Sequence, residues 1–325
     1  MSEPLLDVRA LNVSFPTRHG VARVVLDLDL TVERGETLAV VGESGSGKSV
    51  TMLAVAGLLP SPPARITGEA WFDGVQLIGA SDDELRSVRG ARIGMVFQDP
   101  MTSLNPYLRV GRQVTEGLVE HQGLSKREAA DRAVELLDLV GIPEPARRAR
   151  DYPHEFSGGM RQRVMIATAL ACDPDLLIAD EATTALDVTT QAQIVDLVAS
   201  LQDRLGMAVI WISHDLGVVA RIADRVAVMY AGQVVEQAPV DELFAHPRHP
   251  YTLGLLQSLP VVETAGADLP TIEGLPPDPR HRPPGCAFHP RCPYRLDARC
   301  ATEVPPLREV AAGHWSRSFY EVPDA

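Results

Sequence analysis

The sequence lacks three features that would assign it to a membrane span, a secretory route or a nucleic-acid partner. No stretch approaches the roughly 18 to 20 uninterrupted apolar residues that cross a bilayer, and residues 1–15 contain no charged start followed by an apolar run. Of the four cysteines, Cys172 stands alone and the other three crowd into residues 286–300, a distribution that does not resemble a secreted disulfide framework. With 30 Lys and Arg against 43 Asp and Glu, the charge of −13 disfavours general binding to nucleic acid or anionic lipid. We therefore expect a cytoplasmic chain whose membrane role is peripheral.

Short apolar runs and helical periods alternate along most of the chain. The segment from Glu36 to Val41 is an almost continuous apolar run, which is typical of a strand buried on both faces of a sheet. Residues 176–179 and 208–212 have the same character, and the amphipathic segment 190–205 separates them. Because short buried strands joined by amphipathic helices form parallel sheets with crossover connections, we predict an α/β architecture. A small hairpin is predicted around residues 226–236.

The composition predicts a main domain at residues 1–259 and a smaller unit at residues 260–325. Within the main domain, about residues 99–170 have a mostly helical period and predict a helical subdomain. After Leu259 the sequence becomes rich in proline, and residues 276–284 contain five prolines, which excludes regular helix or central strand there. We call residues 260–325 the C-terminal extension. The chain has no internal repeat, so we expect one nucleotide-binding unit in it.

A glycine-rich loop follows the first buried strand and precedes a helical segment. It matches the pattern G-x-x-x-x-G-K-[ST], in which main-chain N–H groups and a helix N-terminus converge on phosphate oxygens. Its residues are Gly42, Glu43, Ser44, Gly45, Ser46, Gly47, Lys48 and Ser49. We call Gly42–Ser49 the phosphate loop. Lys48 is expected to reach the β- and γ-phosphates of a nucleotide, and the Ser49 hydroxyl to bind Mg²⁺.

Two carboxylates end the buried strand at residues 176–180. Asp180 is expected to hold Mg²⁺ through its water shell, and Glu181 to orient or deprotonate the attacking water. A strand that ends in Asp-Glu is by itself weak support for catalysis. Together with the phosphate loop upstream, it predicts nucleotide hydrolysis.

Residues 156–162 read Phe-Ser-Gly-Gly-Met-Arg-Gln and resemble the signature segment of ABC ATPases. We call these residues the signature segment. The resemblance implies that Ser157, Gly158 and Gly159 contact the γ-phosphate of ATP held by an opposite subunit, with the start of a helix as the anion-binding element.

Other short segments also resemble motifs of ABC ATPases, and they occur along the chain in the order that is usual for that family. By this resemblance, Gln98 links the metal and attacking water to membrane subunits, His214 contacts the γ-phosphate, and Asp187 of Ala185-Leu186-Asp187 lies at the subunit junction. Phe15 resembles the aromatic residue that stacks on adenine, although a core phenylalanine is an interpretation with nearly as much support. Ala182 stands where the family usually has proline, a change that removes no functional group.

A closer resemblance to the ATPases of oligopeptide and dipeptide importers, the peptide and nickel branch, covers nearly the whole chain. It implies an α/β P-loop domain with a parallel sheet core, an antiparallel β part and a helical subdomain, followed by the loop-rich extension. The segments that carry it begin at Phe97 (Phe-Gln-Asp-Pro-Met-Thr-Ser-Leu-Asn-Pro), Tyr152 (Tyr-Pro-His-Glu-Phe-Ser), His249 (His-Pro-Tyr-Thr) and Gly285 (Gly-Cys-Ala-Phe-His-Pro-Arg-Cys-Pro).

This resemblance implies a peripheral ATPase on the cytoplasmic face of the cell membrane, using ATP and Mg²⁺ to drive import of short peptides or a related solute such as nickel. The implied partners are a homologous second ATPase, two transmembrane permease subunits and an extracytoplasmic solute-binding protein, with no nucleic acid. The alternative is a soluble ABC ATPase acting in translation or DNA repair. That class typically has two cassettes or long coiled-coil insertions, and neither is present in this sequence.

Three cysteines, Cys286, Cys292 and Cys300, lie close together in an extension with little apolar content. Thiolates in such a segment suit an iron–sulfur cluster or zinc. Similar importer tails carry a fourth cysteine, consistent with a [4Fe-4S] cluster, and Ser318 stands in its place here. A cluster, zinc and no metal all remain open.

Other side chains could complete or replace this ligand set. His289 and His314 are further candidate ligands in the extension. Cys172 lies in the main domain beside Asp173, and we interpret it as a small buried residue and not as the missing ligand.

Overall fold

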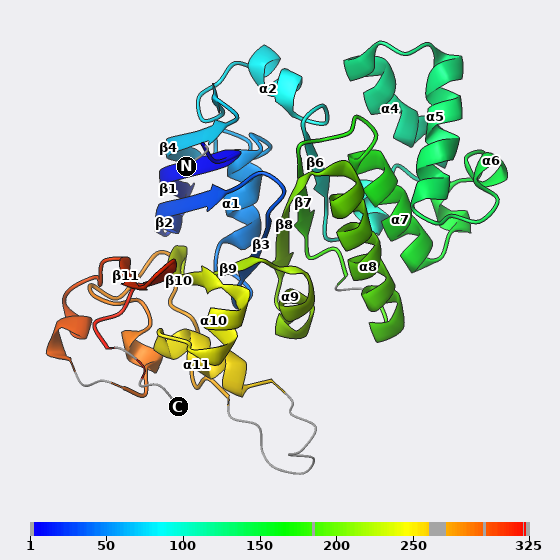
Figure 1. The fold of residues 1–325 in the computed structure, drawn as a ribbon. Helices are drawn as coiled ribbons and strands as arrows, with labels where there is room; N and C mark the ends of the chain where they lie inside the picture. The colour runs from blue at the N-terminus through cyan, green and yellow to red at the C-terminus, as the bar shows by residue number, and fades with distance from the viewer. Residues whose placement is uncertain (1–2, 184–185, 260–270, 295–296, 321, 323–325) are drawn as a thin grey trace. The chain divides into compact units, whose positions relative to one another are not determined.

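The computed structural model describes residues 3–183, 186–259, 271–294, 297–320 and 322 (Figure 1). The chain divides into two compact units, each built from separate stretches of sequence, and each is described by itself. The first unit comprises Met1–Leu5, Val32–Thr37 and Gly79–Ile212. The second unit comprises Leu6–Thr31, Leu38–Ile78 and Ser213–Ala325.

The first unit contains three neighbouring parallel strands, β6 (Ile93–Val96), β7 (Leu176–Asp180) and β8 (Ala208–Ser213). Every residue of β7 and β8 is buried, which explains why both strands are apolar up to their last residue, Asp180 in β7 and Ser213 in β8. Helix α8 (Val188–Leu205) connects β7 to β8 and buries one stripe of Ile194, Val195, Val198 and Leu201. The predicted parallel sheet with a crossover helix is therefore confirmed.

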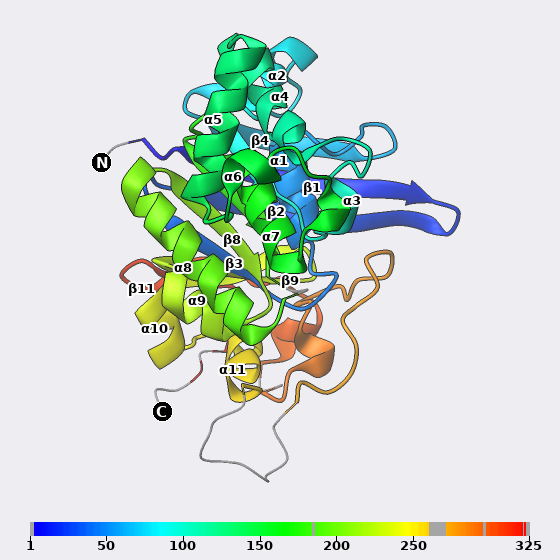
Figure 2. The same cartoon turned by 90° about the vertical axis from the view of Figure 1, so that its right-hand side faces the viewer.

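Helices make up most of the remainder of the first unit. Helix α5 begins at a capping box formed by Ser125 and Glu128, and it buries four residues at helical spacing between Ala129 and Leu137. Helices α4, α5 and α7 pack against one another (Figures 1 and 2). The helical elements are α2 (Asp82–Val88), α3 (Pro100–Ser103), α4 (Val110–Gln122), α5 (Lys126–Leu139), α6 (Pro145–Arg148), the 3₁₀ helix η1 (Pro153–Glu155) and α7 (Gly158–Ala169).

The second unit has two groups of strands. One is an antiparallel sheet in the order β2-β1-β4-β5, and the other has the order β11-β12-β10-β9-β3, in which only β3 and β9 pair in parallel. The predicted hairpin corresponds to β9 and β10 and is confirmed. The strands are β1 (Leu6–Thr17), β2 (Gly20–Val32), β3 (Thr37–Val41), β4 (Arg65–Phe72), β5 (Val75–Gln76), β9 (Arg225–Tyr230), β10 (Gln233–Pro239), β11 (Arg308–Ala311) and β12 (His314–Ser316).

The helices of the second unit are short. Helix α1 follows the phosphate loop, and the proline-rich residues 276–284 form neither helix nor strand, as predicted. None of the helices in the described ranges of the chain combines the length and apolar character that a membrane crossing requires. The helices are α1 (Lys48–Val55), α9 (Leu216–Ile222), α10 (Val240–Ala245), α11 (Pro250–Gln257) and the 3₁₀ helices η3 (His289–Arg291) and η4 (Ala298–Ala301).

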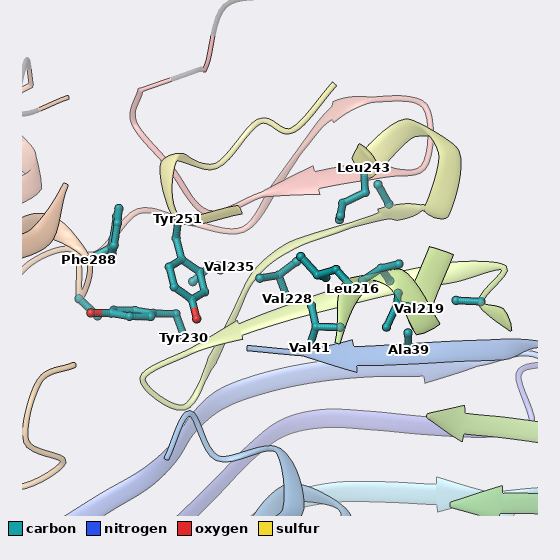
Figure 3. Packing of buried hydrophobic residues seen from close by; sticks show 14 residues of the cluster. Ala39, Val41, Leu216, Val219, Val228, Tyr230, Val235, Leu243, Tyr251 and Phe288 are labelled. Atoms are coloured by element: carbon teal, nitrogen blue, oxygen red, sulfur yellow. The ribbon is translucent and has the colours of Figure 1, made fainter. Parts of the chain in front are cut away.

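A hydrophobic cluster joins the C-terminal extension to the strands of the second unit. Figure 3 shows aliphatic side chains of β3, β9 and α9 at its centre and three aromatic rings at one end. Tyr230 of β9, Tyr251 of α11 and Phe288 of the extension have ring centroids 4.6 to 5.4 Å apart. The expected boundary between residues 259 and 260 lies at the edge of residues 260–270, outside the described residues, and stays a prediction.

Candidate functional site

The phosphate loop connects β3 to α1 in the second unit, as the sequence predicts, and its glycines have backbone conformations that other residues rarely adopt. Gly42, Gly45 and Gly47 have φ angles of 149°, 79° and 100°. A Cβ atom on Gly42 would lie 2.1 Å from the carbonyl oxygen of Met229, and one on Gly47 would lie 2.9 Å from that of Val24. The loop therefore needs glycine both for its turn and for its close approach to neighbouring main chain.

Lys48 is buried at the start of α1, and its ammonium group points back into the loop. Its Nζ donates hydrogen bonds to the carbonyl oxygens of Gly42 at 2.8 Å and Glu43 at 3.1 Å. The Ser46 N–H also donates to the Glu43 carbonyl, at 3.2 Å, so the loop curls around the ammonium group. The Ser46 hydroxyl is buried and has no hydrogen-bond partner among the described residues. A phosphate oxygen fits such a site, because it accepts hydrogen bonds from both hydroxyl and ammonium donors.

Glu43 has partners that the sequence prediction missed. Its N–H donates to the Tyr251 hydroxyl at 2.9 Å, and its carboxylate accepts two hydrogen bonds from Arg291, at 2.7 and 3.0 Å. Both partners lie in the segments that resemble importer ATPases, beginning at His249 and Gly285. That resemblance marked the segments as distinctive, but no spacing in the sequence connects them to the phosphate loop.

The carboxylates predicted at the end of β7 belong to the first unit. Asp180 is buried as the last residue of β7, and Glu181 follows it with a φ of 47°, which is uncommon for a residue with a side chain. The Glu181 N–H donates to the carbonyl oxygen of Ile212 at 3.1 Å. This bond to the adjacent strand fixes the main chain at the point where the carboxylate begins.

Gln98 and Glu181 meet although 83 residues separate them. The Gln98 Nε2 donates a hydrogen bond to Glu181 Oε2 at 2.8 Å. Strands β6 and β7 are parallel neighbours in which Val96 lies opposite Ala179. Gln98 and Glu181 each come two residues later, so they lie at the same edge of the sheet. Gln98 was predicted from the family resemblance and Glu181 from its position at the end of a buried strand, but neither signal indicated that the two side chains bond to each other.

The signature segment and Asp187 lie next to each other in the first unit. Ser157 caps α7, where its hydroxyl accepts a hydrogen bond from the Met160 N–H at 3.3 Å. Gly159 approaches Thr190 of α8 so closely that a Cβ atom on it would lie 2.7 Å from Thr190 Cγ2. Gly158 has Leu186 as its neighbour, with 3.8 Å between its ideal Cβ position and Leu186 Cδ2.

Asp187 begins α8 as its N-cap. Its carboxylate accepts bonds from the Thr190 N–H at 2.9 Å and from the Thr190 hydroxyl at 2.7 Å, and these bonds lower the pKa of Asp187. Ala185 lies outside the described residues. Asp187 and Gly159 therefore share Thr190 as a neighbour, which places the two predicted junction elements side by side.

His214 and Phe15 belong to the second unit. His214 follows β8 and lines a cavity of about 410 Å³ together with Gly42 and Glu43 of the phosphate loop. The structure thus brings the predicted γ-phosphate contact to the same cavity as the start of the loop. Phe15 lies half-buried on β1, and its predicted role beside adenine stays a prediction.

The main chain at the cysteines of the extension is held by hydrogen bonds. The Cys286 N–H donates to the Cys300 carbonyl at 2.9 Å, and the Cys292 N–H donates to the His289 carbonyl at 3.3 Å. Burial raises the pKa of the Cys286 and Cys300 thiols. Among the described residues, no three His, Cys, Asp or Glu side chains are grouped so that they could hold a metal ion. The side chains in this arrangement do not fit the predicted cluster or zinc site.

The other candidate ligands of the extension have different environments. The Ser318 hydroxyl donates to the Tyr320 carbonyl at 2.6 Å and also accepts the Tyr320 N–H. His314 is buried, with its Nε2 2.7 Å from a Glu236 carboxylate oxygen. Cys172 is buried in the first unit, and its thiol pKa is raised by burial, in agreement with its interpretation as a packed core residue.

Two family models match the chain. The ABC transporter model matches residues 25–184, and the model of the oligopeptide/dipeptide transporter C-terminal region matches residues 235–300. The chain is 54% identical over 323 residues to the oligopeptide transport ATP-binding protein OppD of Bacillus subtilis (strain 168), covering 99% of this chain and 90% of that protein. It is 50% identical over 318 residues to OppD of Salmonella typhimurium (strain LT2), covering 98% and 94% of the two chains.

Two solved structures share the fold of roughly three quarters of the chain. The ATP-binding cassette MJ0796, a dimer in a post-hydrolysis state bound to ADP and Pi, has a TM-score of 0.65 and 30% identity. That match covers 72% of this chain and 98% of the other. The cbiO1 protein of Clostridium perfringens, part of the ABC transporter complex cbiONQ, has a TM-score of 0.62 and 30% identity, covering 75% and 92% of the two chains.

Proposed function

The chain belongs to the ABC transporter family, in the branch of oligopeptide and dipeptide transport ATP-binding proteins, and we propose that it hydrolyses ATP to drive the import of short peptides. The observation that carries this proposal is the phosphate loop, with its left-handed glycines, its buried Lys48 and a Ser46 hydroxyl that has no hydrogen-bond partner in the described part of the chain. The relatives OppD and DppD of Bacillus subtilis are named for oligopeptide and dipeptide transport, which supplies the solute class.

In the proposed reaction the second unit binds the nucleotide. Main-chain N–H groups of the phosphate loop and the Ser46 hydroxyl would donate hydrogen bonds to phosphate oxygens, and Lys48 would place its positive charge between the β- and γ-phosphates. His214 would contact the γ-phosphate, and Phe15 would stack on adenine. The bonds from Lys48 to the Gly42 and Glu43 carbonyls hold the ammonium group in the loop until phosphate oxygens replace them.

The first unit supplies the groups that act on water. A water oxygen attacks the γ-phosphorus, the bond from that phosphorus to the bridging oxygen of ADP breaks, and the water proton goes to the Glu181 carboxylate. Gln98 orients that carboxylate through its hydrogen bond to Oε2. We propose Ser49, Gln98 and Asp180 as the residues that hold Mg²⁺, directly or through water, because the ion prefers hard oxygen donors of these kinds. The ion, when bound, neutralises negative charge on the phosphates.

We propose that active sites form only when two ATPase subunits meet. Ser157, Gly158 and Gly159 of this chain would complete a partner's ATP site, and the partner's equivalent segment would complete the site of this chain. The closeness of Gly159 and Asp187 to Thr190 supports a shared role at that junction. The proposed partners are a homologous second ATPase and two permease subunits at the cytoplasmic face of the membrane, with an extracytoplasmic solute-binding protein in the same system.

We propose a cluster or zinc in the extension from the spacing of its cysteines in the sequence, not from the geometry of the site. Three cysteines within fifteen residues favour it, and the described geometry, which groups no three ligands, does not. Anaerobic purification followed by visible absorption and by iron, sulfide and zinc analysis tests it directly. Colourless protein without bound metal contradicts the prediction, and stoichiometric iron with sulfide supports it.

Reconstitution with its partner subunits tests the proposed function. The complete complex in proteoliposomes should take up a labelled tripeptide only in the presence of Mg²⁺ and ATP, and a complex with Lys48→Ala in this chain should not. Nickel offered in place of the peptide distinguishes the two solutes of this family branch. Uptake that does not depend on ATP, or no uptake of any peptide by an ATP-hydrolysing complex, would contradict the proposal.

A further inference from the structure

The second residue of the phosphate loop is a carboxylate, which is an unfavourable charge to place beside the phosphates of a nucleotide. Glu43 lies between Gly42 and the rest of the loop, and its side chain is 25% exposed. A negative charge at this position repels bound phosphate unless a positive charge neutralises it, and the repulsion is stronger near a protein surface than in bulk water. The loop motif leaves this position open, so the motif alone does not explain how a glutamate is accommodated there.

Arg291 of the C-terminal extension supplies the opposite charge. Its side chain is only 6% exposed, and its two terminal nitrogens donate to the two carboxylate oxygens of Glu43 in a fork. The remaining donors are also used, by the carbonyl oxygens of Glu273 at 3.0 Å and Ile272 at 3.2 Å and by the Tyr230 hydroxyl at 3.4 Å. A guanidinium is charged at any physiological pH, and the bond to Glu43 raises the pKa of Arg291 further.

Glu43 in turn holds the main chain that positions the phosphate-binding lysine. Its N–H is bound by the Tyr251 hydroxyl, and its carbonyl oxygen accepts bonds from Lys48 Nζ and from the Ser46 N–H. A shift of Glu43 would move the acceptor for Lys48 and the turn at Ser46 together. A continuous chain of contacts thus runs from Arg291 through Glu43 to Lys48.

An aromatic cluster keeps Arg291 in place. The Arg291 guanidinium lies 5.8 Å from the centroid of the Tyr230 ring, and that ring packs against Tyr251 and Phe288. Figure 3 shows these three rings together at the end of the hydrophobic cluster. Phe288 comes from the same segment of the extension as Arg291, three residues earlier, so burial of its ring against Tyr230 and Tyr251 anchors the segment that carries the guanidinium.

We propose that Arg291 is a positioning residue for the phosphate loop, through which the C-terminal extension sets the affinity of this chain for ATP. It acts by neutralising Glu43, which would otherwise repel the phosphates, while the Tyr251 hydroxyl and the bonds within the loop hold the main chain of Glu43. This inference rests on the proposed function, because it requires that the phosphate loop binds the phosphates of ATP.

Equilibrium titration of the full chain with a fluorescent ATP analogue and Mg²⁺ tests the role of Arg291. Arg291→Gln leaves Glu43 charged and unpaired, so the affinity should fall about three- to tenfold, as expected for one like charge near a partly exposed phosphate site. Added salt should reduce this loss, because it screens the repulsion. The control is Arg280→Gln, which breaks the exposed pair with Asp278 elsewhere in the extension and should bind like the parent.

Glu43→Gln separates neutralisation of charge from simple support of the structure, and it does not depend on Arg291→Gln folding well. With Arg291 intact, Glu43→Gln leaves a net positive charge beside the loop, so ATP should bind at least as tightly as to the parent. In the double variant Glu43→Gln/Arg291→Gln the affinity should return to within about twofold of the parent, because the uncompensated charge is gone. If Arg291 only supported the structure of the loop, both the single variant Glu43→Gln and the double variant would bind ATP more weakly than the parent. That result would overturn the inference.

Two further measurements separate this inference from the proposed function. If the parent binds no ATP analogue, or if Lys48→Ala binds it as well as the parent does, the proposed function fails and this inference fails with it. If the parent and Lys48→Ala behave as proposed but Arg291→Gln binds like Arg280→Gln, only the inference about Arg291 is wrong.

Discussion

The two compact units of the chain carry different kinds of functional groups. The second unit contains the phosphate loop, where Lys48 is buried among main-chain carbonyls and the carboxylate of Glu43 is matched by Arg291. The first unit contains a carboxylate, Glu181, whose partner is the neutral amide of Gln98. One set of groups suits the binding of an anion, and the other suits the removal of a proton from water.

The units also differ in how the site residues are held. In the first unit, neighbouring strands and helix caps position Gln98, Glu181 and Ser157, all through contacts within the sheet or within one helix turn. In the second unit, Arg291 of the C-terminal extension holds Glu43 of the phosphate loop although 248 positions separate them in sequence. Because the two sets of groups are held independently, binding of ATP and chemistry on it should be separable by mutation.

The largest effect should come from Glu181→Gln in the first unit. Because the amide cannot accept the water proton, kcat of the assembled complex should fall about 10²- to 10⁴-fold, the usual contribution of a general base. ATP affinity should stay within about threefold of the parent, a difference below ~1 kcal/mol. Steady-state hydrolysis and ATP titration measure the two quantities, with the exposed Glu303→Gln as control. Hydrolysis within about threefold of the parent would show that Glu181 is not the base.

A smaller loss of kcat is expected from Gln98→Ala, which is also in the first unit. Loss of the hydrogen bond to Glu181 leaves its carboxylate less well oriented, so kcat should fall about tenfold, in line with one hydrogen bond to a charged group. The exposed Gln122→Ala at the end of α4 is the matched control. If Gln98→Ala instead weakened ATP binding tenfold with kcat unchanged, the division of roles between the units would be incorrect.

The smallest effect should come from Phe15→Ala in the second unit. Removal of a ring that stacks on adenine should weaken ATP binding about fivefold, corresponding to ~1 kcal/mol of stacking, without a change in kcat. Phe15→Tyr keeps the ring and should restore binding, whereas a core role for Phe15 predicts loss of thermal stability in place of affinity. Trp71→Ala, on the neighbouring strand β4, controls for the loss of an aromatic side chain from this sheet.

Motifs in the sequence predicted the local parts of this arrangement. The phosphate loop could be found because its glycines and Lys48 have fixed spacing around a strand and a helix, and the parallel strands because burial on both faces requires apolar runs. Gln98 was predicted from the resemblance and Glu181 from its position at the end of a buried strand, but their contact depends on the register of β6 against β7, which no local pattern contains.

The contacts of the extension could not be predicted in the same way. Glu43 occupies an unrestricted position of the loop motif, and the pairing with Arg291 spans 248 residues, so nothing in either segment points to the other. The cysteines show the opposite case. Their close spacing in the sequence predicted a metal site, but spacing does not determine where side chains point. Cys286 and Cys300 are joined by a hydrogen bond between main-chain atoms.

Equilibrium binding of ATP and Mg²⁺ to the parent chain, to Lys48→Ala and to Glu181→Gln tests the division between the units most directly. We predict that Lys48→Ala weakens binding by at least about tenfold, because it removes a buried charge-assisted contact to phosphate, while Glu181→Gln binds within about threefold of the parent. If both variants lost ATP to a similar degree, or if Lys48→Ala bound it as tightly as the parent, the assignment of binding to the second unit and of chemistry to the first would be contradicted.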